Sequence, residues 1–200
     1  MNKNIFKDTK EELEILYREI YLAKCQYIIF EKLYDNLLNI SPNDKLLITK
    51  KGIFDAVEYS VLLKLAKIYD IDKSRQSITL YNMLNKIQCE KELNKNDEKI
   101  KKYVKEKLEN LQNDESIDNI KVFRDKNIAH LDKNYKIGLK GIHKECDLTF
   151  NDIRILLNEA YDIIKMLFKL VLSIDYENDK DFKILQLEIE YCEKELYSKI

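Results

Sequence analysis

Glycine and proline are scarce in this chain of 200 residues, which holds three glycines and one proline. Because these residues end helices and shape turns, their scarcity favours a few long helices joined by short polar connections. The length suits one domain with a real core. The sequence therefore predicts an all-α fold: a single helical-bundle domain over residues 1–200, with its core in about 10–175 and a C-terminal helix in 182–200.

An excess of charge of one sign is also lacking, because 35 basic and 36 acidic side chains leave a net charge of −1. No global field would draw such a protein onto nucleic acid or an anionic membrane, so a polyanion would need a local cluster of cations. The first residues hold no apolar signal core, and no run approaches the roughly 18 apolar residues of a membrane span. We therefore expect a cytoplasmic protein with no membrane partner.

Metal-binding patterns are absent or incomplete. The cysteines lie far apart and form no CxxC pair, which is typical of free thiols: Cys25, Cys89, Cys146 and Cys192. His143 has a metal-like spacing to Cys146, but no second pair accompanies them. Residues 70–74 begin like a calcium loop, yet Arg75 replaces the required glycine and Tyr81 the final acid. We expect no metal and no cofactor.

Apolar residues at spacings of three and four predict the helices. The expected helices span about residues 9–39, 44 or 52 to 69, 77–87, 96–113, 116–132 and 149–174, and the last begins at 182. Ser77 and Thr149 are the expected N-caps of two of them. Residues 70–74 and 133–148 are expected to be loops.

The stretch FRDKNIAHLD, residues 123–132, contains the most informative position of the chain. On a helical wheel Arg124 falls on the same apolar stripe as four branched aliphatic residues, namely Ile117, Ile120, Ile128 and Leu131. Burying an unpaired guanidinium is costly. This arginine should therefore face an acid, a phosphate or a subunit boundary.

His130 lies about 120° around this helix from Arg124 and ~9 Å further along its axis. It shares a side with Asn127, whereas Asp125 and Asp132 line a third face. One helix therefore does not easily bring the arginine and the histidine onto one small group. A twofold contact between two copies of the helix would let two arginines and two histidines converge on one cleft.

This pattern of arginine, polar residues and histidine resembles the Arg-x4-6-His motif of the HEPN superfamily of small helical ribonucleases. The longer form RDKNIAHLD looks most like the abortive-infection, Abi-U-like branch. The segment YSVLLKLAKIYDIDKSRQSITLYNML, residues 59–84, is similar to the same branch: a helix, a short acidic loop and a Ser-x-x-Leu start to the next helix. The likeness covers roughly residues 10–175.

The resemblance implies a metal-independent endoribonuclease that acts as a homodimer, with the motif helices forming the active site. It implies His130 as general base or acid, Arg124 as the ligand of the scissile phosphate, and Asp125 as the residue that orients one of them. Asn127 and Asp132 are accessory candidates. Cleavage of RNA, such as tRNA or mRNA, would leave a 2′,3′-cyclic phosphate. The implied setting is phage defence or a toxin with a nucleotidyltransferase-type antitoxin as partner.

A second interpretation of the same residues stays open. Arg124 would then form a salt bridge with an acid of a neighbouring helix, and His130 would cap the helix end. The protein would be a catalytically inactive HEPN-like module that binds RNA or a protein partner. Geometry distinguishes the two: the enzyme needs both side chains exposed to a shared cleft, whereas the inactive module allows Arg124 to be buried against an acid of its own chain.

Overall fold

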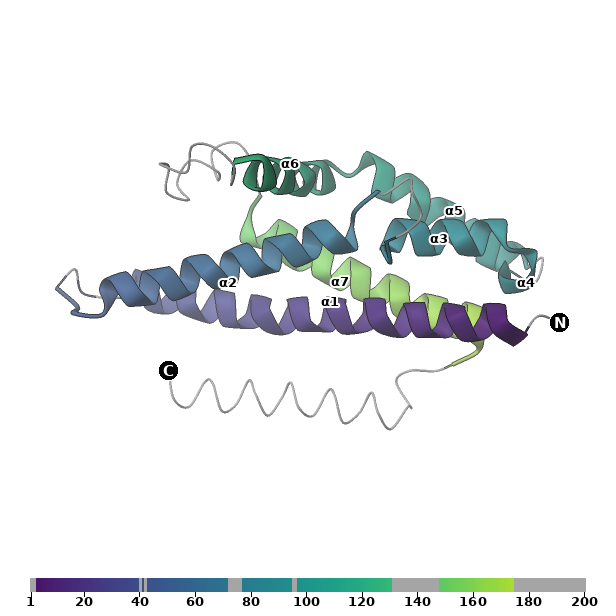
Figure 1. Cartoon of the computed structure of the whole chain (residues 1–200), viewed down its shortest axis with the longest axis horizontal. Helices are drawn as coiled ribbons and strands as arrows, with labels where there is room; N and C mark the ends of the chain where they lie inside the picture. Colours follow the sequence, from purple (N-terminus) through teal and green to yellow (C-terminus); the bar gives the residue numbers. More distant parts are fainter. Residues whose placement is uncertain are drawn as a thin grey trace.

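The computed structural model describes residues 3–39, 41, 43–71, 77–94, 97–130 and 148–174. Within these ranges every regular element is a helix, so the all-α prediction is confirmed (Figure 1). The helices are α1 (Lys3–Leu38), α2 (Leu47–Ile68), α3 (Leu80–Cys89), α4 (Lys91–Asn94), α5 (Glu98–Asn113), α6 (Glu115–His130) and α7 (Phe150–Leu167), which a π-helical turn, η2 (Phe168–Leu172), extends.

Three long helices form the frame of the molecule. α1 runs along its whole length, and α2 and α7 lie antiparallel to it (Figure 1). Apolar residues at spacings of three and four form a buried stripe on α1: Leu13, Leu16, Ile20, Ala23, Tyr27 and Phe30. The ring of Phe30 stacks on Phe54 of α2 at 4.9 Å and on Phe150 of α7 at 4.6 Å. Such burial stabilises the fold by about 1.5–3 kcal/mol per large apolar side chain.

A smaller unit of α3 and α5 covers one end of this frame (Figure 1). The lysine-rich helix α5 has one narrow apolar face, which is buried along its whole length. It consists of Ile100, Val104, Leu108 and Leu111. The opposite side of α5 carries exposed charges, such as Lys105 and Glu109, whose side chains approach to 3.8 Å. This helix is therefore held by one narrow apolar face, as its sequence predicted.

The two predicted N-caps have different outcomes. Thr149 caps α7 through a reciprocal pair of bonds: its hydroxyl accepts from the backbone N–H of Asp152, and the Asp152 carboxylate accepts from the N–H of Thr149. The prediction of Ser77 as a cap was wrong. α3 begins three residues later, and Thr79 accepts the bond from the N–H of Asn82. Ser77 instead accepts from the Asn82 side-chain amide, which holds the approach to the helix.

Several expectations lie outside the described residues: Asp132, the loop over residues 133–147, Cys146, Cys192 and the C-terminal helix in 182–200. On α6 the side chains are described as far as Asp125, and the backbone continues to His130. Cys25 and Cys89 are in no disulfide, as predicted. Of the helices that the structure describes, none is long and apolar enough to cross a membrane.

Candidate functional site

The motif helix α6 packs on α2, at the periphery of the bundle (Figure 1). Its inward side buries Ile117, Ile120 and Phe123. The ring of Phe123 meets the edge of Tyr59 on α2, with 6.0 Å between ring centroids. The two segments that carry the likeness to the Abi-U-like branch therefore touch at Tyr59 and Phe123.

Arg124 follows Phe123 and ends the described apolar stripe of α6. Its Nη1 donates to Oδ1 of Asp70 at 2.5 Å, and its Nε donates to Oδ1 of Asp125 at 2.8 Å. The Arg124 side chain is 26% exposed and that of Asp70 32% exposed. Of the three expected neighbours of this arginine, an acid, a phosphate or a subunit boundary, the structure shows an acid. Asp70 itself was missed, since a partner 54 residues away leaves no local signal in the sequence.

Asp70 is placed by the residue before it. Tyr69 ends α2 and is buried, and its hydroxyl donates to the backbone carbonyl of Leu156 on α7 at 2.6 Å. Burial, with the nearby carboxylates of Glu159 and Asp114, raises the pKa of Tyr69 well above its usual range. The phenol therefore stays protonated and keeps the end of α2 attached to α7.

The charge of this group of three side chains is unbalanced. One guanidinium faces two carboxylates, which leaves a net charge of −1. Partial burial works to lower the pKa of Arg124, but hydrogen bonds to Asp125 and Asp70 outweigh it and raise that pKa. The arginine is thus a permanent cation. A phosphate brought to it would also meet two anions.

The other predicted site residues are placed less fully. Asn127 and His130 belong to the last turns of α6, where the backbone alone is described, and Asp132 lies beyond the described part. The structure puts Arg124, Asp125 and His130 on one continuous helix. It brings Arg124 and Asp125 into contact and leaves the relation of the histidine side chain to them a prediction.

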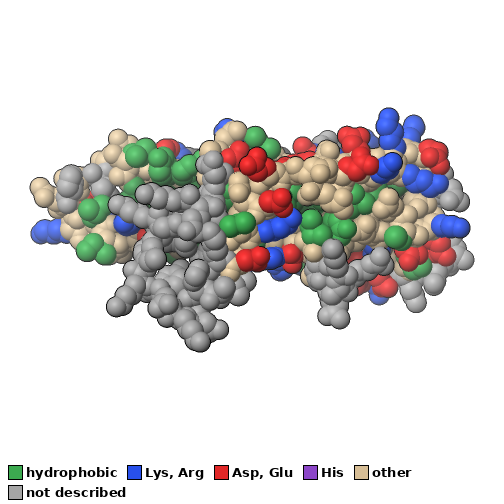
Figure 2. All heavy atoms as spheres, turned by 90° about the horizontal axis from the view of Figure 1, so that it is seen from above, with side chains coloured by type: hydrophobic (Ala, Val, Ile, Leu, Met, Phe, Trp, Pro, Cys, Tyr) green, Lys and Arg blue, Asp and Glu red, His purple; other side chains and the backbone are tan. Residues whose placement is uncertain are grey.

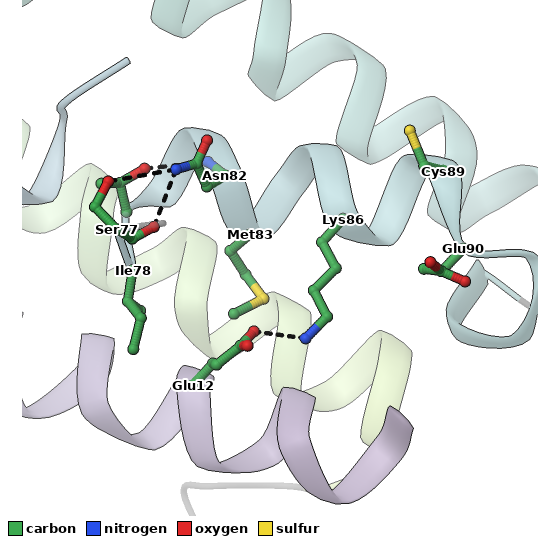
Figure 3. A pocket seen from close by; sticks show the side chains of 9 residues that line it. Glu12, Ser77, Ile78, Asn82, Met83, Lys86, Cys89 and Glu90 are labelled. Atoms are coloured by element: carbon green, nitrogen blue, oxygen red, sulfur yellow. Dashed lines mark hydrogen bonds and ion pairs between the residues drawn. The ribbon is translucent and has the colours of Figure 1, made fainter. Parts of the chain in front are cut away.

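A separate groove of about 190 Å³ lies between α1 and α3 (Figure 3). Lys86 on α3 reaches Glu12 on α1 across it at 2.7 Å, and the side chains of Met83 and Asn82 also line it. It includes none of the residues predicted for the active site. The charged pair is already satisfied, so we assign this groove no reaction.

No metal site emerges from the described residues, and the charges on the face seen in Figure 2 are mixed. No group of three or more histidine, cysteine, aspartate or glutamate side chains is placed to hold a metal ion among them. On the face seen in Figure 2, the described basic and acidic side chains are interspersed with apolar ones.

Comparison with known proteins gives one match. No curated protein and no solved structure matches the chain. The family model HEPN_AbiU2, described as AbiU2, matches residues 6–187. This range includes both segments that carried the resemblance and all of the described helices except the first turn of α1. The chain belongs to the HEPN AbiU2 family, an abortive-infection branch of the HEPN superfamily.

Proposed function

We propose that the protein is a metal-independent endoribonuclease of the HEPN type, acting in the cytoplasm in phage defence or as the toxin of a toxin–antitoxin pair. The observation that carries the proposal is Arg124, a partly exposed, permanently charged guanidinium on the helix that also carries His130. Family membership over residues 6–187 supports the same assignment. A nucleotidyltransferase-type antitoxin is the partner that this class of protein implies.

Each residue has a proposed task in the cleavage of a phosphodiester. His130 takes the proton from the 2′-hydroxyl or gives one to the 5′-leaving oxygen, since an imidazole titrates near neutral pH. The 2′-oxygen attacks the adjacent phosphorus and the bond to the 5′-oxygen breaks, which leaves a 2′,3′-cyclic phosphate and a 5′-hydroxyl. Arg124 stabilises the negative charge that builds on the phosphoryl oxygens. Asp125 orients the guanidinium through Nε, and Asn127 and Asp132 are accessory candidates.

We further propose that the site is completed by a second copy of the chain. The inward side of α6 is used up by its contact with α2, whereas Asp118, Val122 and Asp125 face outward. Val122 is a large apolar side chain with 38% exposure, which a twofold contact would bury. Val122→Glu is expected to give a monomer in analytical ultracentrifugation, whereas Ile48→Glu, at an exposed position of α2, leaves the dimer intact. A monomeric wild type at micromolar concentration would contradict this arrangement.

The test of the activity is cleavage of total bacterial RNA, including tRNA, in the presence of EDTA. Arg124→Ala and His130→Ala are expected to lower the rate at least 100-fold, the usual range for loss of a charge-stabilising or acid–base group. Arg154→Ala is the matched control. Arg154 is an exposed arginine of α7 that donates to the side chain of Asn151 in its own helix at 2.8 Å. End-group analysis of the fragments should find cyclic phosphates.

Two results would remove the proposal. Cleavage that both substitutions leave unchanged would assign the activity to another site or to a contaminant. A folded dimer with no cleavage would favour the second candidate, a catalytically inactive HEPN module that binds RNA or a protein. One observation favours that candidate: Arg124 is paired with Asp70 of its own chain. The module would then bind RNA without cutting it.

A further inference from the structure

The guanidinium of Arg124 has two edges that can each present two nitrogens to a phosphate. In both edges one nitrogen already binds a carboxylate. A guanidinium takes up a phosphate through two parallel N–H bonds, from Nη1 and Nη2 or from Nε and Nη2. Asp70 already occupies Nη1, and Asp125 already occupies Nε. Each edge therefore contains a nitrogen that already binds a carboxylate, so a phosphate that binds both nitrogens of an edge competes with that carboxylate.

Of the two carboxylates, Asp70 is the one that can leave. Asp125 is the next residue on α6 and stays beside the guanidinium as long as the helix is formed. Asp70 lies two residues beyond the end of α2, outside any helix. Its carboxylate is 32% exposed and lies at the negative end of the α2 dipole, where an anion is disfavoured. Rotation of this side chain into water leaves Tyr69 and its bond to α7 in place.

We propose that Asp70 is an internal competitor for RNA phosphate at Arg124. In the free protein its carboxylate occupies the edge of Nη1, and an RNA backbone phosphate takes that edge by displacing it. The inference rests on the proposed function, in which Arg124 is the phosphate ligand. Asp70 thereby weakens RNA binding and restrains the ribonuclease, and its replacement strengthens both.

Asp70→Asn tests this, because it removes one charge and keeps the shape of the side chain. Asp70→Ser is a second variant for the case that asparagine destabilises the fold. Glu12→Gln is the matched control. Glu12 on α1 pairs with Lys86 on α3 at 2.7 Å, and their side chains are 34% and 29% exposed. Both changes alter the net charge equally. Only the change at position 70 touches Arg124.

The first measurement is NMR of isotope-labelled arginine side chains, titrated with inorganic phosphate and then with a 2′-O-methyl RNA oligonucleotide, which cannot be cleaved. The chain holds four arginines, so the Nε–H signal of Arg124 is assigned by its loss in Arg124→Ala. Phosphate is expected to bind at least about fivefold more tightly in Asp70→Asn than in the wild type, which is the effect of removing a unit charge ~4 Å away with full screening by water. Glu12→Gln should match the wild type.

Equal or weaker binding in both Asp70 variants would overturn the inference, and weaker binding would make Asp70 a residue that positions Arg124. An Arg124 signal that phosphate moves in no variant would overturn it as well. The cleavage assay separates this outcome from failure of the proposed function. Tighter phosphate binding without any cleavage leaves the competitor in place and removes the ribonuclease. Cleavage that depends on Arg124 and His130, but that Asp70→Asn does not accelerate, keeps the ribonuclease and removes the competitor.

Discussion

α6 and α7 are helices of similar length, yet they are built differently. α7 begins with a reciprocal cap and buries seven apolar side chains along one stripe, from Ile153 to Leu167. On α6 the described stripe of Ile117, Ile120 and Phe123 stops at Arg124, a charged side chain in a position that suits leucine. α7 is therefore organised for packing. α6 gives up apolar contact to hold a guanidinium at the surface, which is the arrangement expected of a helix that carries a binding site.

The largest effect should come from shortening the stripe of α7. Leu157→Ala is expected to lower the free energy of unfolding by about 3 kcal/mol, since Leu157 is 1% exposed and its loss leaves a cavity in the core. Ile155→Ala, on the exposed side of the same helix, should cost less than about 1 kcal/mol. Urea denaturation measures both. Equal costs for the two variants would mean that α7 is not the packing helix described here.

The counterpart on α6 should behave in the opposite way. Arg124→Leu is expected to change the free energy of unfolding by less than about 1 kcal/mol, because the lost ion pair is offset by apolar contact along the stripe. The same change should remove RNA cleavage. A loss of stability comparable with that of Leu157→Ala would instead make Arg124 a structural residue and weaken the contrast between the helices.

Loss of the cap of α7 should lower stability less than the loss of Leu157 does. Thr149→Ala removes the hydroxyl that accepts from the N–H of Asp152 and should cost about 1 kcal/mol. Thr149→Ser keeps the hydroxyl and should recover most of that loss. Thermal unfolding followed by circular dichroism would show both. Equal melting temperatures for the alanine and serine variants would show that the cap does not contribute.

The smallest effect concerns a charge pair of the frame rather than of the site. Glu19 on α1 lies 3.3 Å from Lys64 and 3.2 Å from Lys67 on α2. Partial burial raises the pKa of its carboxyl, but the two lysines outweigh this and lower the pKa below the ordinary 4.5. A carboxyl with a lowered folded pKa stabilises the protein above its unfolded pKa, and that contribution is lost as pH falls through the folded pKa.

Glu19→Gln should therefore lower stability by less than about 1 kcal/mol at neutral pH. The difference from wild type should shrink as the pH falls below ~4.5 and vanish below the lowered folded pKa. Urea denaturation at several pH values measures this. Glu14→Gln alters an ion pair within α1, to Lys10 at 3.5 Å. Its free energy of unfolding should differ from that of the wild type by only about 0.2–0.5 kcal/mol. A Glu19 difference that persists at low pH would come from packing and not from charge.

Much of the fold could be predicted from the sequence, because apolar spacing acts locally. The stripe of α1 from Leu13 to Phe30, the seam of α5 and the cap at Thr149 all follow from residues close in the chain. The start of α3 could not be predicted in the same way. Ser77 and Thr79 are both competent caps, and the choice between them depends on the tertiary position of the segment, where Thr79 is buried.

The site was predicted in part. Arg124 on an apolar stripe required an acidic or anionic partner, and an acid is there. Which acid it is depends on how α2 and α6 pack, and the sequence around Asp70 suggested only an incomplete calcium loop. The roles of Arg124, Asp125 and His130 in cleavage stay predictions, as do those of Asn127 and Asp132.

The hydrogen bond from Tyr69 to the carbonyl of Leu156 can form only after the ribosome has made α7. Asp70, Arg124 and Leu156 lie far apart in the chain, and α7 is made after the other two. A nascent chain that ends before α7 has both partners of the arginine pair, but it lacks the acceptor that fixes the end of α2. Contacts of such long range form late in folding. The support that Tyr69 gives to the end of α2 beside Asp70 is therefore complete only after α7 has been made.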